Sequence, residues 1–148
     1  MEKEYKNPNR IGKEFNEFCI ISGDPKIGKG TWVGYFCLID GSGGLEIGDH
    51  CAISSGVHIY THDAVRWATH NLEKDRINHS HIDRDSVKIG NNVFIGANSV
   101  ILKGVTIGDN VVIGALTLVN RDIPDNSIAV GIPAKITKKG EIKKEEKK

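Results

Sequence analysis

A six-residue spacing between aliphatic side chains is the feature of this sequence that most restricts its fold. Thirteen positions in three runs share the spacing: Ile21, Ile27, Val33 and Ile39, then Ile47, Ile53 and Ile59, then Ile89, Ile95, Ile101, Ile107, Ile113 and Val119. An α-helix places apolar residues every three or four positions and a half-buried strand every two, so a sustained period of six fits neither element alone. It indicates short strands separated by corners and stacked as the coils of a solenoid.

The kinds of apolar residue support an all-β solenoid. The 148 residues include 20 Ile and 11 Val but only 6 Leu, and β-branched side chains favour strands. Two residues before each repeated aliphatic lies a second, mostly small residue, which faces the same side of a strand. All three cysteines, Cys19, Cys37 and Cys51, occupy this second position. We therefore expect them to be small buried core residues rather than nucleophiles.

Two interruptions break the period. The spacing from Ile39 to Ile47 is eight, and the extra residues form a glycine-rich stretch that predicts a tight corner loop. The spacing from Ile59 to Ile89 is 30, and the intervening residues are polar and lack the repeat. Long loops inside compact domains are uncommon and often functional, so we expect a protruding loop at about 63–86.

The sequence divides into a repeat domain and two short ends. We expect an N-terminal extension at 1–18, the repeat domain with a short C-terminal cap at 19–136, and a charged tail at 137–148. Lys plus Arg number 20 and Asp plus Glu 19, a formal charge of +1 that argues against a nucleic-acid partner. The longest apolar runs are too short for a membrane span or a secretory signal, so we expect a cytoplasmic protein.

The pattern resembles the hexapeptide repeat of the hexapeptide-repeat acyltransferases over about residues 19–136. Gly follows the repeated aliphatic at seven positions, which are Gly28, Gly34, Gly48, Gly90, Gly96, Gly108 and Gly114. The resemblance implies a left-handed parallel β-helix, a hand opposite to that of ordinary parallel crossovers. It also implies a homotrimer of parallel prisms with the sites in the clefts between them.

His62 is the residue to which the resemblance assigns catalysis. It lies where the coil leads into the long loop, and the loop returns at Ile-Gly-Asn-Asn-Val from Ile89 to Val93, as in sugar and xenobiotic acetyltransferases. The similarity implies direct transfer of acetyl from acetyl-CoA to a hydroxyl or amine of a sugar or sugar-like acceptor. Imidazole titrates near neutral pH and can remove the acceptor's proton as a general base.

Two aspartates near His62 are candidate substrate-binding residues. Asp63 or a backbone carbonyl could hold the imidazole in the required tautomer, and the sequence leaves this choice open. Asp40 replaces the usual Gly at the shorter interruption. It could contact the acceptor or only cap the turn, and both readings stay open.

The C-terminal half supplies the candidate binding site for acetyl-CoA. By resemblance to the galactoside acetyltransferases, small residues would meet the pantetheine arm and polar or cationic residues the rest of the molecule. The residues are Ala97, Ala115, Asn120, Arg121, Lys135 and Lys138. Lys135 and Lys138 stand at arginine positions of the family, which preserves charge but not bidentate geometry. No metal is expected.

Two alternatives belong to other functional classes. A γ-type carbonic anhydrase on the same fold would need three converging histidines, and His58, His62, His79 and His81 are candidates without a ligand spacing. A non-catalytic scaffold subunit would bind no acyl-CoA. The acetyltransferase reading is preferred, with an acceptor in surface polysaccharide or lipopolysaccharide synthesis.

Overall fold

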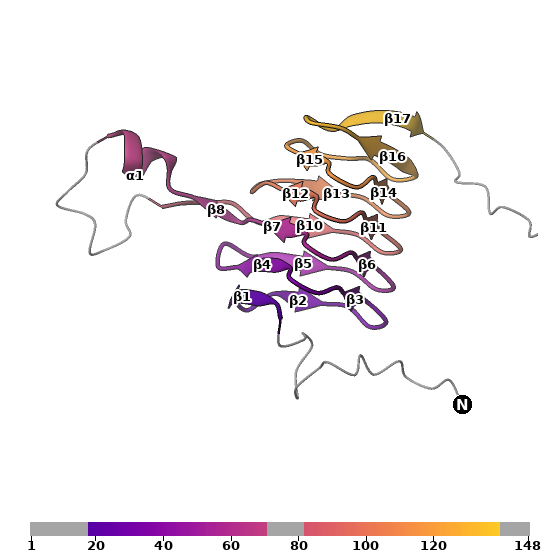
Figure 1. Ribbon diagram of the computed structural model, residues 1–148, viewed down its shortest axis with the longest axis horizontal. Helices are drawn as coiled ribbons and strands as arrows, with labels where there is room; N and C mark the ends of the chain where they lie inside the picture. The colour runs from indigo at the N-terminus through magenta and orange to yellow at the C-terminus, as the bar shows by residue number, and fades with distance from the viewer. Residues whose placement is uncertain (1–17, 71–81, 140–148) are drawn as a thin grey trace, which may run out of the picture.

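Residues 18–70 and 82–139 are described by the computed structural model, and most of them form a parallel β-helix (Figure 1). The first face contains β1 (Ile20–Gly23), β4 (Leu38–Gly41), β7 (His58–Ile59), β12 (Val100–Ile101) and β15 (Leu118–Val119). The second face contains β2 (Lys26–Ile27), β5 (Leu45–Ile47), β10 (Val87–Ile89) and β13 (Thr106–Ile107). The third face contains β3 (Trp32–Val33), β6 (Ala52–Ile53), β11 (Phe94–Ile95), β14 (Val112–Ile113), β16 (Ser127–Val130) and β17 (Lys135–Lys139).

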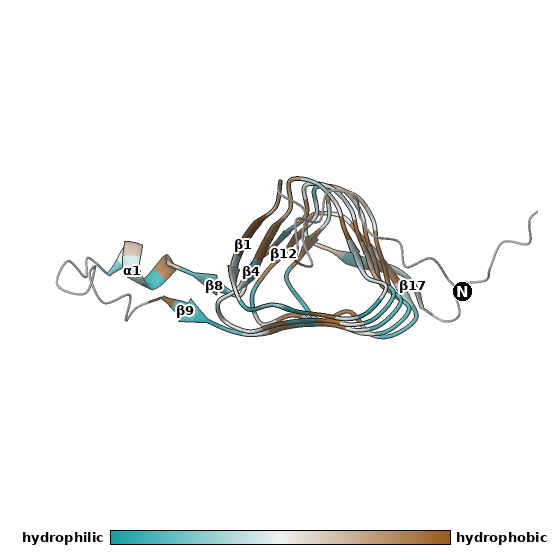
Figure 2. Ribbon diagram, turned by 90° about the horizontal axis from the view of Figure 1, so that it is seen from below, coloured by the Kyte–Doolittle hydropathy of each residue, from teal (hydrophilic) through white to brown (hydrophobic). Residues whose placement is uncertain are grey.

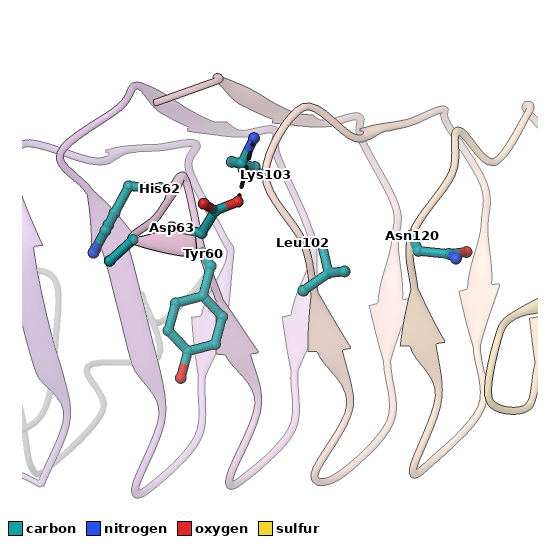
Figure 3. A pocket seen from close by; sticks show the side chains of 7 residues that line it. Tyr60, His62, Asp63, Leu102, Lys103 and Asn120 are labelled. Carbon is teal, nitrogen blue, oxygen red and sulfur yellow. Dashed lines mark ion pairs between the residues drawn. The ribbon is translucent and has the colours of Figure 1, made fainter. Parts of the chain in front are cut away.

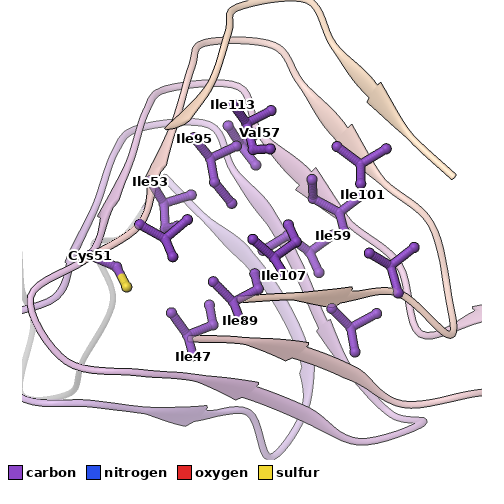
Figure 4. Packing of buried hydrophobic residues seen from close by; sticks show 14 of the residues in the cluster. Ile47, Cys51, Ile53, Val57, Ile59, Ile89, Ile95, Ile101, Ile107 and Ile113 are labelled. Atoms are coloured by element: carbon purple, nitrogen blue, oxygen red, sulfur yellow. The ribbon is translucent and has the colours of Figure 1, made fainter. Parts of the chain in front are cut away.

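The period of six arises because equivalent aliphatics stack in register from coil to coil. On the first face, Ile39 pairs with Ile59, Ile59 with Ile101, and Ile101 with Val119. Eleven of the thirteen repeated aliphatics are buried, and their side chains meet inside the triangular coil (Figure 4). The exceptions, Ile21 and Ile27, belong to the first coil. The all-β, left-handed parallel β-helix expected from the sequence is confirmed.

The cysteines pack within this core. Cys37 and Cys51 are buried, and Cys19 is half-buried. Each thiol donates a hydrogen bond to a backbone carbonyl of the next coil, for example from Cys37 Sγ to the oxygen of Ser54 at 3.2 Å. Burial raises the pKa of the Cys37 thiol to about 11, which leaves it protonated and unreactive at neutral pH.

An arm leaves the solenoid at the corner between its first and second faces (Figure 2). Strand β8 (His62–Asp63) pairs antiparallel with β9 (Asp83–Arg84), and the short helix α1 (Val65–Thr69) follows β8. The arm is the loop expected at about 63–86, and it places His62 at its base.

An antiparallel pair of strands, β16 and β17, lies at the C-terminal end of the solenoid. Strand β16 continues the parallel third face, and β17 then runs back along it. Strand β17 extends to Lys139, so three residues of the segment expected to be a charged tail lie in a strand.

Candidate active site

A histidine–aspartate pair lies at the base of the arm. His62 Nδ1 is 2.6 Å from Oδ2 of Asp40. Asp40 lies in β4, the first-face strand that pairs with β7 just before His62. The His62 side chain is 38% exposed, whereas that of Asp40 is only 1% exposed. The pair therefore joins a solvent-facing imidazole to a carboxylate inside the protein.

Both oxygens of the Asp40 carboxylate accept hydrogen bonds from neighbouring residues. Oδ1 accepts from Ser22 Oγ at 2.8 Å and from the backbone N–H of Ser42 at 2.9 Å. Oδ2 accepts from the N–H and the hydroxyl of Thr61, at 2.8 and 2.9 Å, as well as facing His62. Burial raises the pKa of Asp40, but the hydrogen bonds from Ser42, Thr61 and Ser22 outweigh it and hold the pKa well below its ordinary value.

The nearest partner of Nδ1 is thus Asp40, a residue that the sequence analysis did not consider for this task, and Ser42 Oγ lies 3.3 Å from the same nitrogen. Asp63 makes other contacts: Oδ1 accepts from the N–H of Val65 at 3.1 Å, and Oδ2 lies 3.4 Å from Lys103 Nζ. Asp40 also caps the corner loop through the Ser42 N–H, one of the two roles left open for it. Its burial leaves no surface for direct contact with an acceptor.

The ionised state of Asp40 gives a testable pH dependence of stability. Its pKa is lowered in the folded protein, so its stabilising effect is complete above the unfolded value of about 3.9 and is lost as the pH falls below it. Replacement by asparagine should flatten the fall in unfolding free energy below about pH 4, by up to about 1.4 kcal/mol per pH unit. Urea unfolding of both proteins between pH 3 and 6 measures this difference. An identical slope in both would contradict an ionised buried Asp40.

A pocket of about 530 Å³ lies beside His62 (Figure 3). It is lined by Tyr60, His62, Asp63, Ala64, Leu102, Lys103 and Asn120. Tyr60, Leu102 and Asn120 directly follow inward aliphatics on three successive coils, so the pocket extends along the solenoid from His62 to Asn120. His58 fixes one wall, because its Nδ1 is 3.2 Å from the Tyr60 hydroxyl.

Four lining residues were missed from the sequence: Tyr60, Ala64, Leu102 and Lys103. One signal could have found two of them. Gly never follows the repeated aliphatic on the first face, where the residues at this position are Ser22, Asp40, Tyr60, Leu102 and Asn120. All five belong to the pocket or to the hydrogen bonds around Asp40.

Of the six candidate acetyl-CoA residues, only Asn120 lines this pocket. Ala97 and Ala115 lie on stacked corners between the third and first faces, joined by the Leu116 N–H bond to the oxygen of Ala97 at 2.9 Å. Ala115 is exposed and Ala97 is half-buried.

The three candidate cations lie nearer the C-terminal end of the solenoid. Arg121 is exposed and directly follows Asn120. Lys135 is exposed at the start of β17, where it pairs with Val130. Lys138 pairs with Ile128 through its backbone, and its side chain lies outside what the structure describes.

The other candidate histidines do not join His62. His58 contacts Tyr60, and His79 and His81 lie outside the described residues. Within residues 18–70 and 82–139, no group of three His, Cys, Asp or Glu side chains is arranged to hold a metal ion. The same residues include no helix with the length and apolar character needed to cross a membrane.

Comparisons with known proteins agree with this architecture. Residues 86–121 match the family described as bacterial transferase hexapeptide (six repeats). Protein CapG of Staphylococcus aureus is 52% identical over 92 residues, which are 62% of this chain and 50% of CapG. The chain thus spans about half the length of this curated relative.

The fold is shared with solved structures, among them an N-acyltransferase and a maltose O-acetyltransferase. AntD, an N-acyltransferase from Bacillus cereus solved in complex with dTDP and 3-hydroxybutyryl-CoA, has a TM-score of 0.71 and 29% identity, covering 84% of this chain and 67% of AntD. A maltose O-acetyltransferase from Clostridium difficile 630 has a TM-score of 0.61 and 33% identity, covering 83% of this chain and 67% of its own.

The fold is a β-helix built from stacked six-residue repeats, with a histidine–aspartate pair at the base of its arm. The chain belongs to the hexapeptide-repeat acyltransferase family.

Proposed function

We propose that the protein transfers an acetyl group from acetyl-CoA to a hydroxyl or amine of a sugar or sugar-like acceptor. The observation that carries the proposal is the His62–Asp40 pair, with its nitrogen–oxygen distance of 2.6 Å, at one end of the pocket. Relatives that are named acetyltransferases or acyltransferases support the reaction class. The surface-polysaccharide or lipopolysaccharide context belongs to the same proposal and rests on the family resemblance. A cytoplasmic location is also part of the proposal.

His62 is the general base of the proposed reaction. Asp40 is ionised and accepts the proton of Nδ1, which leaves Nε2 of the neutral ring free to take the acceptor's proton. The same carboxylate stabilises the imidazolium that forms. The hydrogen bonds from Ser22, Ser42 and Thr61 fix Asp40, so the ring orientation is set before the substrates bind.

Acetyl-CoA supplies an activated thioester, and the residues present suit its parts. The pocket runs from His62 to Asn120 and offers a path for a narrow, extended arm. Arg121 and Lys135 are exposed cations beyond its Asn120 end, where a phosphate-bearing group would be neutralised. AntD was solved with an acyl-CoA, which supports the same ligand class here.

A homotrimer belongs to the proposal, and the solenoid surface supports it. Outward residues of the first and third faces are largely apolar and include Leu38, Val100, Trp32 and Phe94, whereas the second face carries Lys26, Glu46 and Lys88. Two apolar faces and one charged face suit a prism packed against two neighbours.

Light scattering coupled to size-exclusion chromatography should give three times the chain mass at micromolar concentration. The apolar faces would otherwise stay in water, which disfavours the single chain. Lys88→Met, on the charged face, is a control that should leave the mass unchanged. A mass equal to one chain would contradict a trimer with its sites in the clefts between chains.

The reaction itself is tested by release of coenzyme A thiol from acetyl-CoA in the presence of nucleotide sugars and glycans, with mass spectrometry of the products. Acceptor-dependent acetylation that survives a chelator supports the proposal. Hydration of carbon dioxide that is lost with a chelator, together with a stoichiometric bound ion, would favour the carbonic anhydrase alternative. Failure to bind acetyl-CoA would favour the scaffold.

A further inference from the structure

An ion pair inside the pocket has no part in the proton transfer described above. Lys103 Nζ lies 3.4 Å from Asp63 Oδ2, and both residues line the pocket that contains His62 (Figure 3). Their side chains are partly covered, with 30% and 38% exposed. Asp63 directly follows the proposed base, and Lys103 lies in the turn after β12.

Backbone hydrogen bonds at the base of the arm lie next to both members of this pair. The Val65 N–H donates to the other oxygen of Asp63, and Val65 and Lys103 hold the pKa of Asp63 below its ordinary value. Next to Lys103, the Gly104 N–H donates to the oxygen of Asp85 at 3.3 Å, and the Asp85 N–H donates to Thr61 at 2.9 Å. The geometry therefore presents a carboxylate and an ammonium together at one side of the pocket.

This pairing has a chemical preference. A carboxylate only accepts hydrogen bonds and an ammonium only donates them. A hydroxyl does both, so a single hydroxyl can donate to Asp63 and accept from Lys103. A carboxylate on the acceptor could form a hydrogen bond only with Lys103, and an ammonium could form one only with Asp63.

We propose, on the basis of the proposed function, that Asp63 and Lys103 together recognise a second hydroxyl of the acceptor, beside the one that is acetylated. Lys103 is then a specificity-determining residue, and the acceptor class is a polyhydroxylated one with two neighbouring hydroxyls. A partly exposed ion pair contributes little to folding, so its substitution leaves a folded protein in which recognition can be measured.

The test compares methyl glycosides of glucose, galactose and mannose with their single-deoxy derivatives, using acetyl-CoA as donor. The parent protein should favour the glycoside over the derivative that lacks the neighbouring hydroxyl by about 10–100-fold in kcat/KM, the range for hydrogen bonds to charged groups. Lys103→Met and Asp63→Asn should each bring this ratio close to one, mainly by raising KM for the glycoside. Lys26→Met, in an ion pair with Asp24 on the second face, is the matched control and should keep the parent ratio.

A purely structural role for the pair makes a different prediction. Both rates would then fall together in Lys103→Met and the ratio would stay at the parent value, which would overturn the proposal. Equal rates for glycoside and deoxy derivative in the parent, or a preference for amino or carboxylated sugars, would overturn it too. Absence of acetyl transfer to every sugar would instead defeat the proposed function.

Binding supplies a readout that needs no turnover. With coenzyme A in place of acetyl-CoA, the carboxyl ¹³C signal of Asp63 should shift on addition of the glycoside but not of the deoxy derivative. The signal should not respond to the glycoside in Lys103→Met. A response to both sugars alike would contradict the assignment.

Discussion

Replacement of His62 by alanine is expected to lower the turnover of acetyl transfer by about 10²–10⁴-fold, the usual contribution of a positioned general base. The substitution should affect only the chemistry of the imidazole. The His62 side chain is more than a third exposed, so its removal takes no packing from the core. The oligomeric state and the affinity for acetyl-CoA should therefore stay close to those of the parent. Steady-state kinetics with the identified acceptor and calorimetric titration of coenzyme A measure the two quantities separately.

His70→Ala is the matched control for this substitution. His70 is exposed at the C-terminal end of α1, and it does not line the pocket. Its removal should leave turnover near the parent value. If His62→Ala kept full transfer to the true acceptor, the general-base assignment would have to be abandoned.

Asp40→Asn is expected to have the second largest effect, a loss of at least about 10²-fold in kcat at neutral pH. The amide can turn its NH₂ toward Nδ1 and hold the wrong tautomer, and it carries no charge to stabilise the imidazolium. Because Asp40 is buried and does not line the pocket, KM for acetyl-CoA should change little.

Ser22→Ala distinguishes the role of the Asp40 charge from the role of the hydrogen bonds that hold the carboxylate in place. This change removes one hydrogen bond at 2.8 Å but leaves the carboxylate and the contact with His62. Its effect on kcat should be much smaller, about 10-fold or less. An equal loss in Ser22→Ala and Asp40→Asn would show that packing around the carboxylate matters rather than its charge.

The stacking of the coils could be predicted from the sequence because it depends on a short, strict period. Each inward aliphatic has the same environment, so the spacing between Ile89 and Val119 alone specifies the strands, the corners and the core. The place of His62 followed from the long break in that period together with the family resemblance.

The contacts of the site could not be predicted, because they join coils across interruptions of different length. The two extra residues after Ile39 lengthen this coil from 18 residues to 20, so that Ile39 pairs with Ile59. The Asp40 carboxylate then contacts Thr61 and His62, 21 and 22 positions further along the chain. The arm between Ile59 and Ile89 likewise brings Lys103 next to Asp63. Linear spacing gives no measure of how an inserted loop turns its side chains. The sequence therefore offered Asp40 only as an acceptor contact or a turn cap, and Lys103 was missed.

The central claim is that Asp40 acts through His62, and a double-mutant cycle in kcat for acetyl transfer tests it most directly. The account predicts that Asp40→Asn, which is damaging in the parent, has almost no further effect in His62→Ala, because residues that act as a unit are not additive. Single and double variants are compared at one pH with saturating acetyl-CoA. A double variant slower than His62→Ala by the full factor of Asp40→Asn would show that the two residues act independently and would contradict the account.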